Sequence, residues 1–300
     1  MTLIFSNKKI PQKGFTLVEL LVVITVIGLL SSIIFAITRG ADEQGRIAKG
    51  LYFSQHLHNS LGSYAAGIWS FDEGTGTVAN DISGWGNNGT LVNSPTWRCA
   101  TTDPSYTPSG QGCSLEFDGI DDYINCGTST AFAMRGGNHT LEAWVYPTAI
   151  DNTYNYIVSI GNDETGKQSG IGIKDASQLF LSAYSSPIVN TDYLIPGLNQ
   201  WYHIVMSYDG NTDVASFYVN GMWVENESIT LDTTVGKCRI GVHLGDGSFF
   251  KKGLIDEVRI YATDLTAAQI QSQYYAGLNR LLTKNLITEQ KYQQRLVVSK

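Results

Sequence analysis

The 300-residue chain has few of the residues from which metal sites and nucleophilic enzyme sites are built. It holds only four cysteines, none of them in a Cys-x-x-Cys pair, and none of its five histidines lies within four residues of a cysteine. A zinc site made of closely spaced cysteine and histidine ligands is therefore not expected. The sequence also lacks a Ser/His/Asp constellation and a phosphate-binding glycine loop, which argues against catalysis of either kind.

Basic residues are scarce in the largest part of the chain. Residues 65–279 carry 23 acidic against 9 basic side chains, a net charge of −14. An acidic surface repels a phosphate backbone, so nucleic acid is not an expected partner. The basic tail, residues 280–300, has a net charge of +4, which suits either a solvated extension or a contact with an acidic neighbour.

Charges are almost absent from residues 15–38, the longest apolar run in the chain. As a helix this run would be about 36 Å long, which is enough to cross a bilayer. Lysines at positions 8, 9 and 13 precede it, so the N-terminus is expected in the cytoplasm and the bulk of the chain outside. The single charge within the run, Glu19, costs roughly 2.5–3.5 kcal/mol in hydrocarbon and should have a partner. The plain alternative is a signal anchor that tolerates one polar residue near its end.

The sequence Gly-Phe-Thr-Leu-Val-Glu at residues 14–19 resembles the class III leader of type IV pilins and type II secretion pseudopilins. The resemblance implies that a prepilin peptidase cleaves between Gly14 and Phe15 and methylates the new amino group of Phe15. It also implies that Glu19 pairs with that amino group on a neighbouring subunit. Residues 1–14 are then the leader peptide, and residues 15–38 are the transmembrane helix.

Residues 39–64 read as an extension of this helix. Ile47, Leu51 and His58 fall on one face at helical spacing, which predicts packing against a globular domain or a neighbouring subunit. Major pilins usually carry a helix-breaking proline where this chain has Ala36. Glycines at positions 40, 45 and 50 each weaken a helix by about 1 kcal/mol relative to alanine.

Residues 65–279 have the composition of an all-β domain. Runs of four to eight strand-forming residues alternate with turn residues, and no long helical pattern separates them. Asn220-Gly221 between two such runs predicts a type I′ hairpin turn. We therefore expect an antiparallel sandwich with one sizeable core, closed by a short helix over residues 266–275.

The order of the segments in this domain is similar to that of a LamG-like jelly roll of the concanavalin A-like lectin/glucanase superfamily. The segments that carry the resemblance are residues 69–76, 81–89, 115–124, 140–145, 200–210, 218–221 and 254–261. The resemblance implies an all-β antiparallel jelly-roll sandwich for residues 65–279, preceded by the transmembrane helix. It says little about function, because one fold hosts many activities.

Glucanases of this superfamily place their catalytic carboxylates on one strand as Glu-x-Asp-x-x-Glu, and the chain has no such run. Asp256 and Glu257 are adjacent and so should point to opposite sides of a strand, while Glu116 and Glu142 stand alone in the sequence. A retaining glycosidase needs two carboxyl groups about 5–5.5 Å apart. We therefore expect no enzymatic activity.

The four cysteines all follow the apolar run, on the side where disulfides persist. Cys99 and Cys113 bracket a loop rich in proline, serine and threonine, so a bridge between them is expected. Cys126 and Cys238 are then paired by subtraction.

Calcium is the one metal that the sequence suggests. The loop at residues 81–89 is rich in oxygen donors and glycine, although it lacks the EF-hand spacing. Many LamG-like domains hold calcium, and this similarity suggests Asp81, Asn87 and Asp256 as ligands. The alternative is that Asp81 and Asn87 only provide turn geometry and hydrogen bonds.

Aromatic side chains offer a surface for stacking sugar rings. Trp85, Trp97, Tyr154 and Tyr156 fall in loops or at strand edges and are the expected ligand-binding residues, with subunit contacts as the alternative. Three other tryptophans, at positions 144, 201 and 223, lie within strand patterns and are expected in the core.

The two resemblances together imply a pilin-like, membrane-anchored filament subunit that displays a lectin-like domain for adhesion or surface recognition. Its expected location is the inner or cytoplasmic membrane, crossed once with the body outside the cytoplasm, and then the assembled pilus or cell surface. Expected partners are other pilin-like subunits, the prepilin peptidase, the membrane, and glycans or surface proteins. Two alternatives stay open: a pseudopilin-type component of a type II secretion-like machine, and an uncleaved membrane-anchored glycan-binding surface protein.

Overall fold

The computed structural model describes residues 17, 21–22, 24–25, 61–150, 154–174, 178–183, 188–234, 236–245, 252–283, 287–288, 290 and 292. The predicted processing and assembly residues, Gly14, Phe15 and Glu19, lie outside this set. The chain divides into two units, residues 1–49 and 50–300. The described residues of the first unit are helical, and Thr25 Oγ1 donates a hydrogen bond to the Leu21 carbonyl oxygen (2.6 Å).

The described residues contain no helix that combines the length and the apolar character needed to cross a bilayer. Most of the expected transmembrane helix and of its extension over residues 39–64 falls outside the described residues. Both therefore stay predictions.

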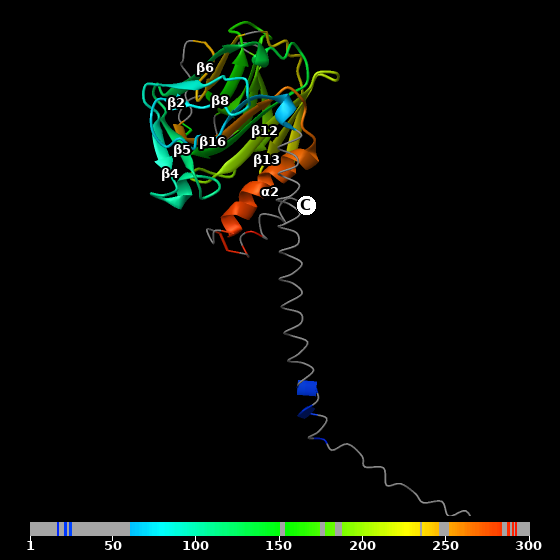
Figure 1. Cartoon of the computed structure of the whole chain (residues 1–300). Coiled ribbons are helices and arrows are strands. Elements are labelled where there is room, and N and C mark those ends of the chain that lie inside the picture. The colour runs from blue at the N-terminus through cyan, green and yellow to red at the C-terminus, as the bar shows by residue number, and fades with distance from the viewer. Residues whose placement is uncertain are drawn as a thin grey trace, which may run out of the picture. The chain divides into compact units, whose positions relative to one another are not determined.

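The second unit is a sandwich of two stacked antiparallel sheets (Figure 1). One sheet, sheet A, has the order β14-β13-β12-β7-β16-β5-β4, with β1 also paired to β16. The other, sheet B, has the order β11-β10-β9-β8-β15-β6-β3-β2. The strands are β1 (Ala65–Trp69), β2 (Val78–Ala79), β3 (Gly89–Val92), β4 (Thr96–Cys99), β5 (Cys113–Asp118), β6 (Tyr123–Ser129), β7 (His139–Pro147), β8 (Tyr154–Gly161), β9 (Gln168–Lys174), β10 (Gln178–Ser182), β11 (Ile188–Leu194), β12 (Tyr202–Asp209), β13 (Val214–Val219), β14 (Met222–Ser228), β15 (Gly236–Ile240) and β16 (Lys252–Tyr261).

The strand order has the interleaved pattern of a jelly roll. From β5 to β8 the chain alternates between the two sheets, and from β14 to β16 it alternates again. As a result β16 lies between β5 and β7 in sheet A, and β15 lies between β6 and β8 in sheet B. The expectation of an antiparallel jelly-roll sandwich is confirmed.

The hairpin turn between β13 and β14 also follows the sequence. Asn220 and Gly221 have φ of 53° and 76°, the pair of positive values that a type I′ turn requires. The ladder shifts register between Phe217 and Tyr218, so β14 departs from simple alternation just after the turn.

The main core lies between the sheets and is built from alternate positions of the strands. On β7 and β12 these positions are Leu141, Ala143, Val145, Tyr202, Ile204, Met206 and Tyr208. Facing them from sheet B are Val158, Ile160, Ile171, Ile173, Leu179, Leu181, Cys238 and Ile240.

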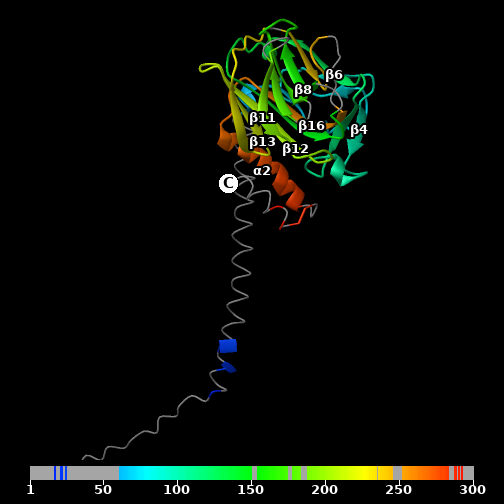
Figure 2. The same ribbon diagram turned by 180° about the vertical axis from the view of Figure 1, so that it is seen from behind.

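The outer face of sheet A is covered by α2 (Ala267–Thr283), which lies beside β12 and β13 (Figures 1 and 2). Thr266 and Gln269 form a capping box at its start, because Gln269 N donates to Thr266 Oγ1 (3.3 Å) and Thr266 N donates to Gln269 Oε1 (2.8 Å). The helix is longer than residues 266–275, and it crosses the expected boundary at residue 280. The reason is an apolar face that continues past Tyr274 through Leu278 to Leu282.

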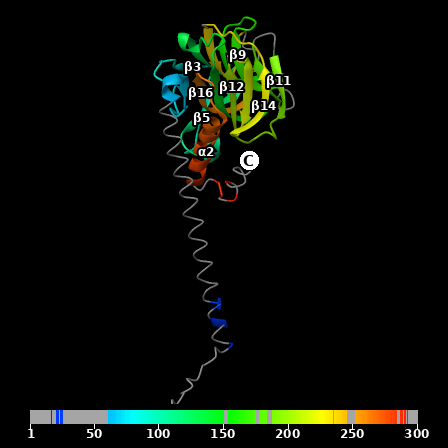
Figure 3. The same cartoon turned by 90° about the vertical axis from the view of Figure 1, so that its right-hand side faces the viewer.

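The described residues of the basic tail also pack on this face. Tyr292 is buried in a cluster with Trp144, Tyr274 and Leu278, and Ile287 packs against the same cluster (Figure 3 shows α2 from the side). The start of the tail therefore packs against the body.

The body begins at a second small cluster on the outer face of sheet A. The 3-10 helix η1 (Gly62–Tyr64) leads from Leu61 into β1, and Leu61 is buried together with Ala65, Tyr218 and Ile270. Leu61, which lies three residues before the expected end of the helical extension, is thus fixed to the sandwich before the first strand starts. Two further 3-10 helices are η2 (Pro104–Tyr106) and η3 (Thr130–Phe132).

Candidate functional site

The Trp85 loop, residues 81–88, joins β2 to β3 and is organised by one carboxylate. Asp81 Oδ1 accepts hydrogen bonds from Ile68 N (3.0 Å) and Ser83 N (2.9 Å), and its Oδ2 accepts one from Asn87 N (2.9 Å). Hydrogen bonds to a charged acceptor are about twice as strong as neutral ones. Asp81 therefore fixes both ends of the loop and ties them to β1.

Two asparagines complete this attachment. Asn87 Nδ2 donates to Ala66 O (3.0 Å), and Asn88 Oδ1 accepts from Asp81 N (2.9 Å). The indole Nε1 of Trp69, a fully buried residue of β1, donates to Asn87 O (3.1 Å). The loop is thus a rigid extension of β1.

The tip of the loop presents two large apolar side chains to solvent. Ile82 is 60% exposed and Trp85 is 57% exposed. Gly84 and Gly86, on either side of Trp85, have φ of 96° and 72°, which a residue with a side chain rarely adopts. The expectation that Trp85 is exposed is confirmed.

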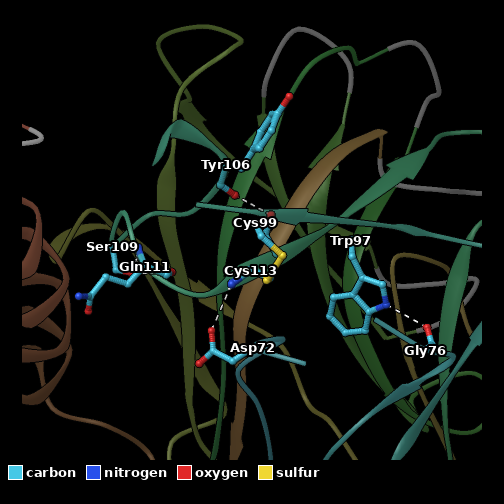
Figure 4. The surroundings of a disulfide bond; sticks show 9 residues. Asp72, Gly76, Trp97, Cys99, Tyr106, Ser109, Gln111 and Cys113 are labelled. Atoms are coloured by element: carbon cyan, nitrogen blue, oxygen red, sulfur yellow. Dashed lines mark hydrogen bonds between the residues drawn. A yellow bond between two sulfur atoms is a disulfide. The ribbon is translucent and has the colours of Figure 1, made fainter. Parts of the chain in front are cut away.

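The other expected ligand-binding aromatics lie elsewhere. Trp97 on β4 is half-buried, and its Nε1 donates to Gly76 O (2.9 Å), as Figure 4 shows. Tyr154 on β8 is half-buried, with its ring edge-on to Phe180 (5.2 Å between centroids). The expectation of an exposed Tyr156 is wrong: it is 2% exposed and packs between Phe180 and His243, which raises its pKa to about 12 through burial.

The structure therefore does not gather the four aromatics in one site. Trp85 lies on the β2–β3 loop, Trp97 in sheet A, and the two tyrosines in sheet B. The expectation of three core tryptophans also needs correction, since Trp223 is 57% exposed and Trp201, just before β12, is half-buried. Trp223 lies on β14, an edge strand, where one face stays open to solvent.

The residues suggested for calcium lie on different elements: Asp81 and Asn87 on the β2–β3 loop and Asp256 on β16. Asp256 is buried in β16, and among the described residues no hydrogen bond joins it to Asp81 or Asn87. Burial, together with the nearby charge of Glu257, raises the pKa of Asp256 well above its usual range. Asp81 and Asn87 have the turn-forming role given as the alternative. Calcium binding and this choice of ligands both stay predictions.

Three other carboxylates do lie together within the described residues. Oxygen atoms of Asp118, Asp121 and Asp122 all fall within 4.8 Å of one another. Asp118 Oδ1 accepts from Ile120 N (2.7 Å), and Asp122 Oδ2 accepts from Asp118 N (3.0 Å). These bonds form the turn between β5 and β6.

The Cys99–Cys113 disulfide is confirmed. The two residues are paired directly across β4 and β5, and Asp72 Oδ1 accepts a hydrogen bond from Cys113 N (3.3 Å; Figure 4). The bridge closes the loop that contains η2.

Cys126 and Cys238 differ from the expectation, because both are free thiols. They lie on the neighbouring strands β6 and β15, hydrogen-bonded to each other inside the core. Burial, then this hydrogen bond, raises the pKa of the Cys126 thiol well above its usual range. Pairing by subtraction failed because a small apolar thiol is also an ordinary core side chain.

A buried charged cluster beneath α2 was missed by the sequence analysis. Glu142 Oε1 accepts from Arg259 Nη1 (2.8 Å) and contacts His203 Nε2 (2.9 Å), so Glu142 does not stand alone. Arg259 Nη1 also donates to Gln273 Oε1 of α2 (2.9 Å). Burial would raise the pKa of Glu142, but the charge of Arg259 and the His203 contact lower it. No local sequence pattern could show this cluster, since its members come from β7, β12, β16 and α2.

Two family profiles match the chain. Residues 118–271 match the concanavalin A-like lectin/glucanases superfamily, and residues 10–35 match the prokaryotic N-terminal methylation motif. The first match covers more than half of the chain, so the protein belongs to the concanavalin A-like lectin/glucanases superfamily. It also carries a prokaryotic N-terminal methylation motif, which indicates membrane anchoring or assembly at the surface.

Solved structures share the fold. Domain 4 of AbnA, an extracellular GH43 arabinanase from Geobacillus stearothermophilus solved with arabinotriose, is 21% identical with a TM-score of 0.51, covering 69% of this chain and 97% of that one. The binding domain of botulinum neurotoxin serotype G is 16% identical with a TM-score of 0.53; the match covers 71% of this chain and 51% of the neurotoxin domain. A mutant Trypanosoma rangeli sialidase is 14% identical with a TM-score of 0.54; the match covers 80% of this chain and 39% of the sialidase.

This chain thus spans about half of the neurotoxin domain and about two fifths of the sialidase. Identities this low show the fold alone. Among curated proteins none matches the chain in sequence.

Proposed function

We propose that this protein is a pilin-like subunit, anchored in the membrane by its N-terminal helix and assembled into a filament that displays the sandwich for adhesion or surface recognition. The observation that carries the proposal is the combination of an N-terminal methylation motif at residues 10–35 with a lectin-type sandwich in one chain. The motif implies processing by a prepilin peptidase and assembly with other pilin-like subunits. The acidic body suits a protein ligand or a glycan better than nucleic acid.

The role proposed for the sandwich is binding, without catalysis. Its distant structural relatives include a sialidase, and Glu142 and Glu257 both contact Arg259. These contacts support a structural role, because Glu142 is fully buried beneath α2 and the charge of Arg259 keeps it ionised. A general acid for glycoside cleavage instead needs a raised pKa and access to the substrate.

Sugar binding is tested with the full-length protein in detergent on a glycan array. We expect a defined set of oligosaccharides to bind, and we expect Tyr154→Ser or Trp97→Ser to weaken that binding because both rings keep an exposed part. Glu164→Gln, an exposed position on a turn, is the matched control. Binding to no glycan would remove the lectin-like role and leave recognition of a protein surface.

Assembly is tested by replacing Glu19 with glutamine in the full-length protein. The charge that should meet the methylated amino group of a neighbour is then lost, so incorporation into filaments should fall while membrane insertion persists. Glu164→Gln again serves as the control. Filaments that form equally well with Glu19→Gln would contradict the proposal.

The alternatives are separated by two further observations. An uncleaved surface protein would be unaffected by replacing Gly14, whereas a pilin-like subunit would stay unprocessed and fail to assemble. A pseudopilin-type component would be processed in the same way but would be absent from filaments outside the cell, as immunolabelling of the sandwich would show.

A further inference from the structure

Residues 78–85 carry three exposed apolar side chains, here called the patch, on β2 and on the Trp85 loop that is bonded to β1. Val78 of β2 is 42% exposed, and Ile82 and Trp85 are exposed by more than half. Single exposed apolar residues are ordinary, but three within eight residues mark a place where a partner can remove apolar surface from water.

The patch is preorganised. The three hydrogen bonds that Asp81 accepts and the bond from Asn87 to Ala66 O hold the loop against β1, and Ser83 Oγ accepts from Trp85 N (3.3 Å). A rigid aromatic side chain loses little conformational entropy on binding, which is why tryptophan is frequent among interface anchors.

The polar groups of the loop face inward, and this points to the kind of partner. The carboxylate of Asp81 and the side-chain amide of Asn87 bond to the loop itself and to β1. A sugar site needs polar groups that fix the hydroxyls of the ligand beside the aromatic ring. The outward face of this loop offers mainly the apolar surface of Ile82 and Trp85, which suits a protein surface.

Charge favours the same surface for contact between copies. The body carries a net charge of −14, so two copies repel each other over most of their surfaces. Residues 82–88 of the loop contain no Asp, Glu, Lys or Arg, although the body has 32 charged residues. This neutral stretch is where two acidic bodies can meet without bringing like charges together.

The position of the patch fits assembly. The loop bonds to Ala66 and Ile68, only a few residues after position 64, where the helical extension is expected to end. In a filament held together by its helices, the part of the body closest in sequence to the helix stays near the neighbouring subunit.

We infer that Ile82 and Trp85 form a docking surface for a second copy of this chain in the filament. The inference rests on the proposed function and assigns Trp85 to assembly instead of ligand binding. Docking buries the apolar tip of the loop.

The test places the photo-reactive residue p-benzoyl-phenylalanine at position 85 of the full-length protein and irradiates cells that carry it. Position 223 is the matched control, because Trp223 is also 57% exposed. We expect a cross-linked dimer of this chain from position 85 and at least tenfold less from position 223. A cross-link from position 85 to a different protein only, or equal yields from both positions, would overturn the inference.

A second measurement separates docking from ligand binding. Trp85→Ser should reduce filament yield at least tenfold while the melting temperature and glycan binding stay unchanged, and Trp223→Ser should change none of them. Reduced glycan binding with normal filaments would overturn the inference and would indicate that Trp85 binds the ligand. If the parent protein is never processed or assembled, the proposed function is wrong. If position 85 then also gives no cross-linked dimer, the docking surface is ruled out as well.

Discussion

At the scale of single residues, polar side chains that bond to the backbone fix the local structure of this sandwich. Asp81 accepts three backbone hydrogen bonds, and His139 is fully buried between Gly137 O and Ser169 Oγ (2.9 Å each). Removing one partner from such a bond leaves a buried group unsatisfied. These residues therefore offer sharper tests than substitutions at the apolar core.

Asp81→Asn should destabilise the body by about 1–3 kcal/mol, because an amide NH₂ would oppose at least one of the three backbone N–H donors. The measurement is the free energy of unfolding in denaturant, with Glu164→Gln as the exposed control. An unchanged stability would show that the loop is held by other contacts. The same variant answers the calcium question: if a chelator lowers the melting temperature equally in parent and variant, Asp81 is not a calcium ligand.

The burial of His139 predicts how the free energy of unfolding depends on pH. Burial lowers its pKa from 6.5 to about 4, so between these values the unfolded chain binds a proton that the folded chain does not. Stability should therefore fall as the pH drops through this window, by about 3 kcal/mol in total. The carboxyl groups of Asp72 and Asp256 have raised pKa values and act in the opposite direction, so the parent must be compared with His139→Gln.

The variant should lose this part of the pH dependence while the rest of the profile is retained. Equal slopes for parent and variant between pH 6.5 and pH 4 would contradict the assignment to His139.

At the scale of elements, β4 and β5 are joined both by strand pairing and by the Cys99–Cys113 bridge. A bridge over a sequence separation of 14 residues lowers the conformational entropy of the unfolded chain and thereby stabilises the folded chain by about 3 kcal/mol. The double variant Cys99→Ser/Cys113→Ser should lose up to this amount. Peptide mapping without reduction should find this bridge alone, with Cys126 and Cys238 alkylated only after unfolding. A bridge between Cys126 and Cys238 would contradict the structure.

Local patterns predicted most of the elements. The Asn220-Gly221 turn, the strand runs and the capped start of α2 are all encoded within a few neighbouring residues. The length of α2 was underestimated because its second half is held by contacts with Trp144, which no local pattern reveals.

The sites were harder to predict than the fold. Tyr156 and Trp223 were assigned to the wrong environments, since exposure depends on which strand forms a sheet edge and on what covers each face. The cluster of Glu142, His203 and Arg259 joins residues more than 60 positions apart in sequence and depends wholly on topology. Asp81 was singled out correctly as a polar loop residue, but its partners Ile68 and Asn87 became visible only in the fold.

At the scale of the whole molecule, the chain combines an N-terminal methylation motif with a body of the concanavalin A-like lectin/glucanases superfamily. Family membership of the body and the methylation motif are established by separate parts of the sequence, and η1 with Leu61 connects the body to the segment that follows the motif. The central claim is therefore that the N-terminus is matured as in a pilin.

The most direct measurement is the intact mass of the full-length protein purified from membranes or filaments of its own cells. The account predicts a product that begins at Phe15 and carries one added methyl group on its amino terminus. A product that begins at Met1, in membranes that process other pilin-like proteins normally, would contradict it.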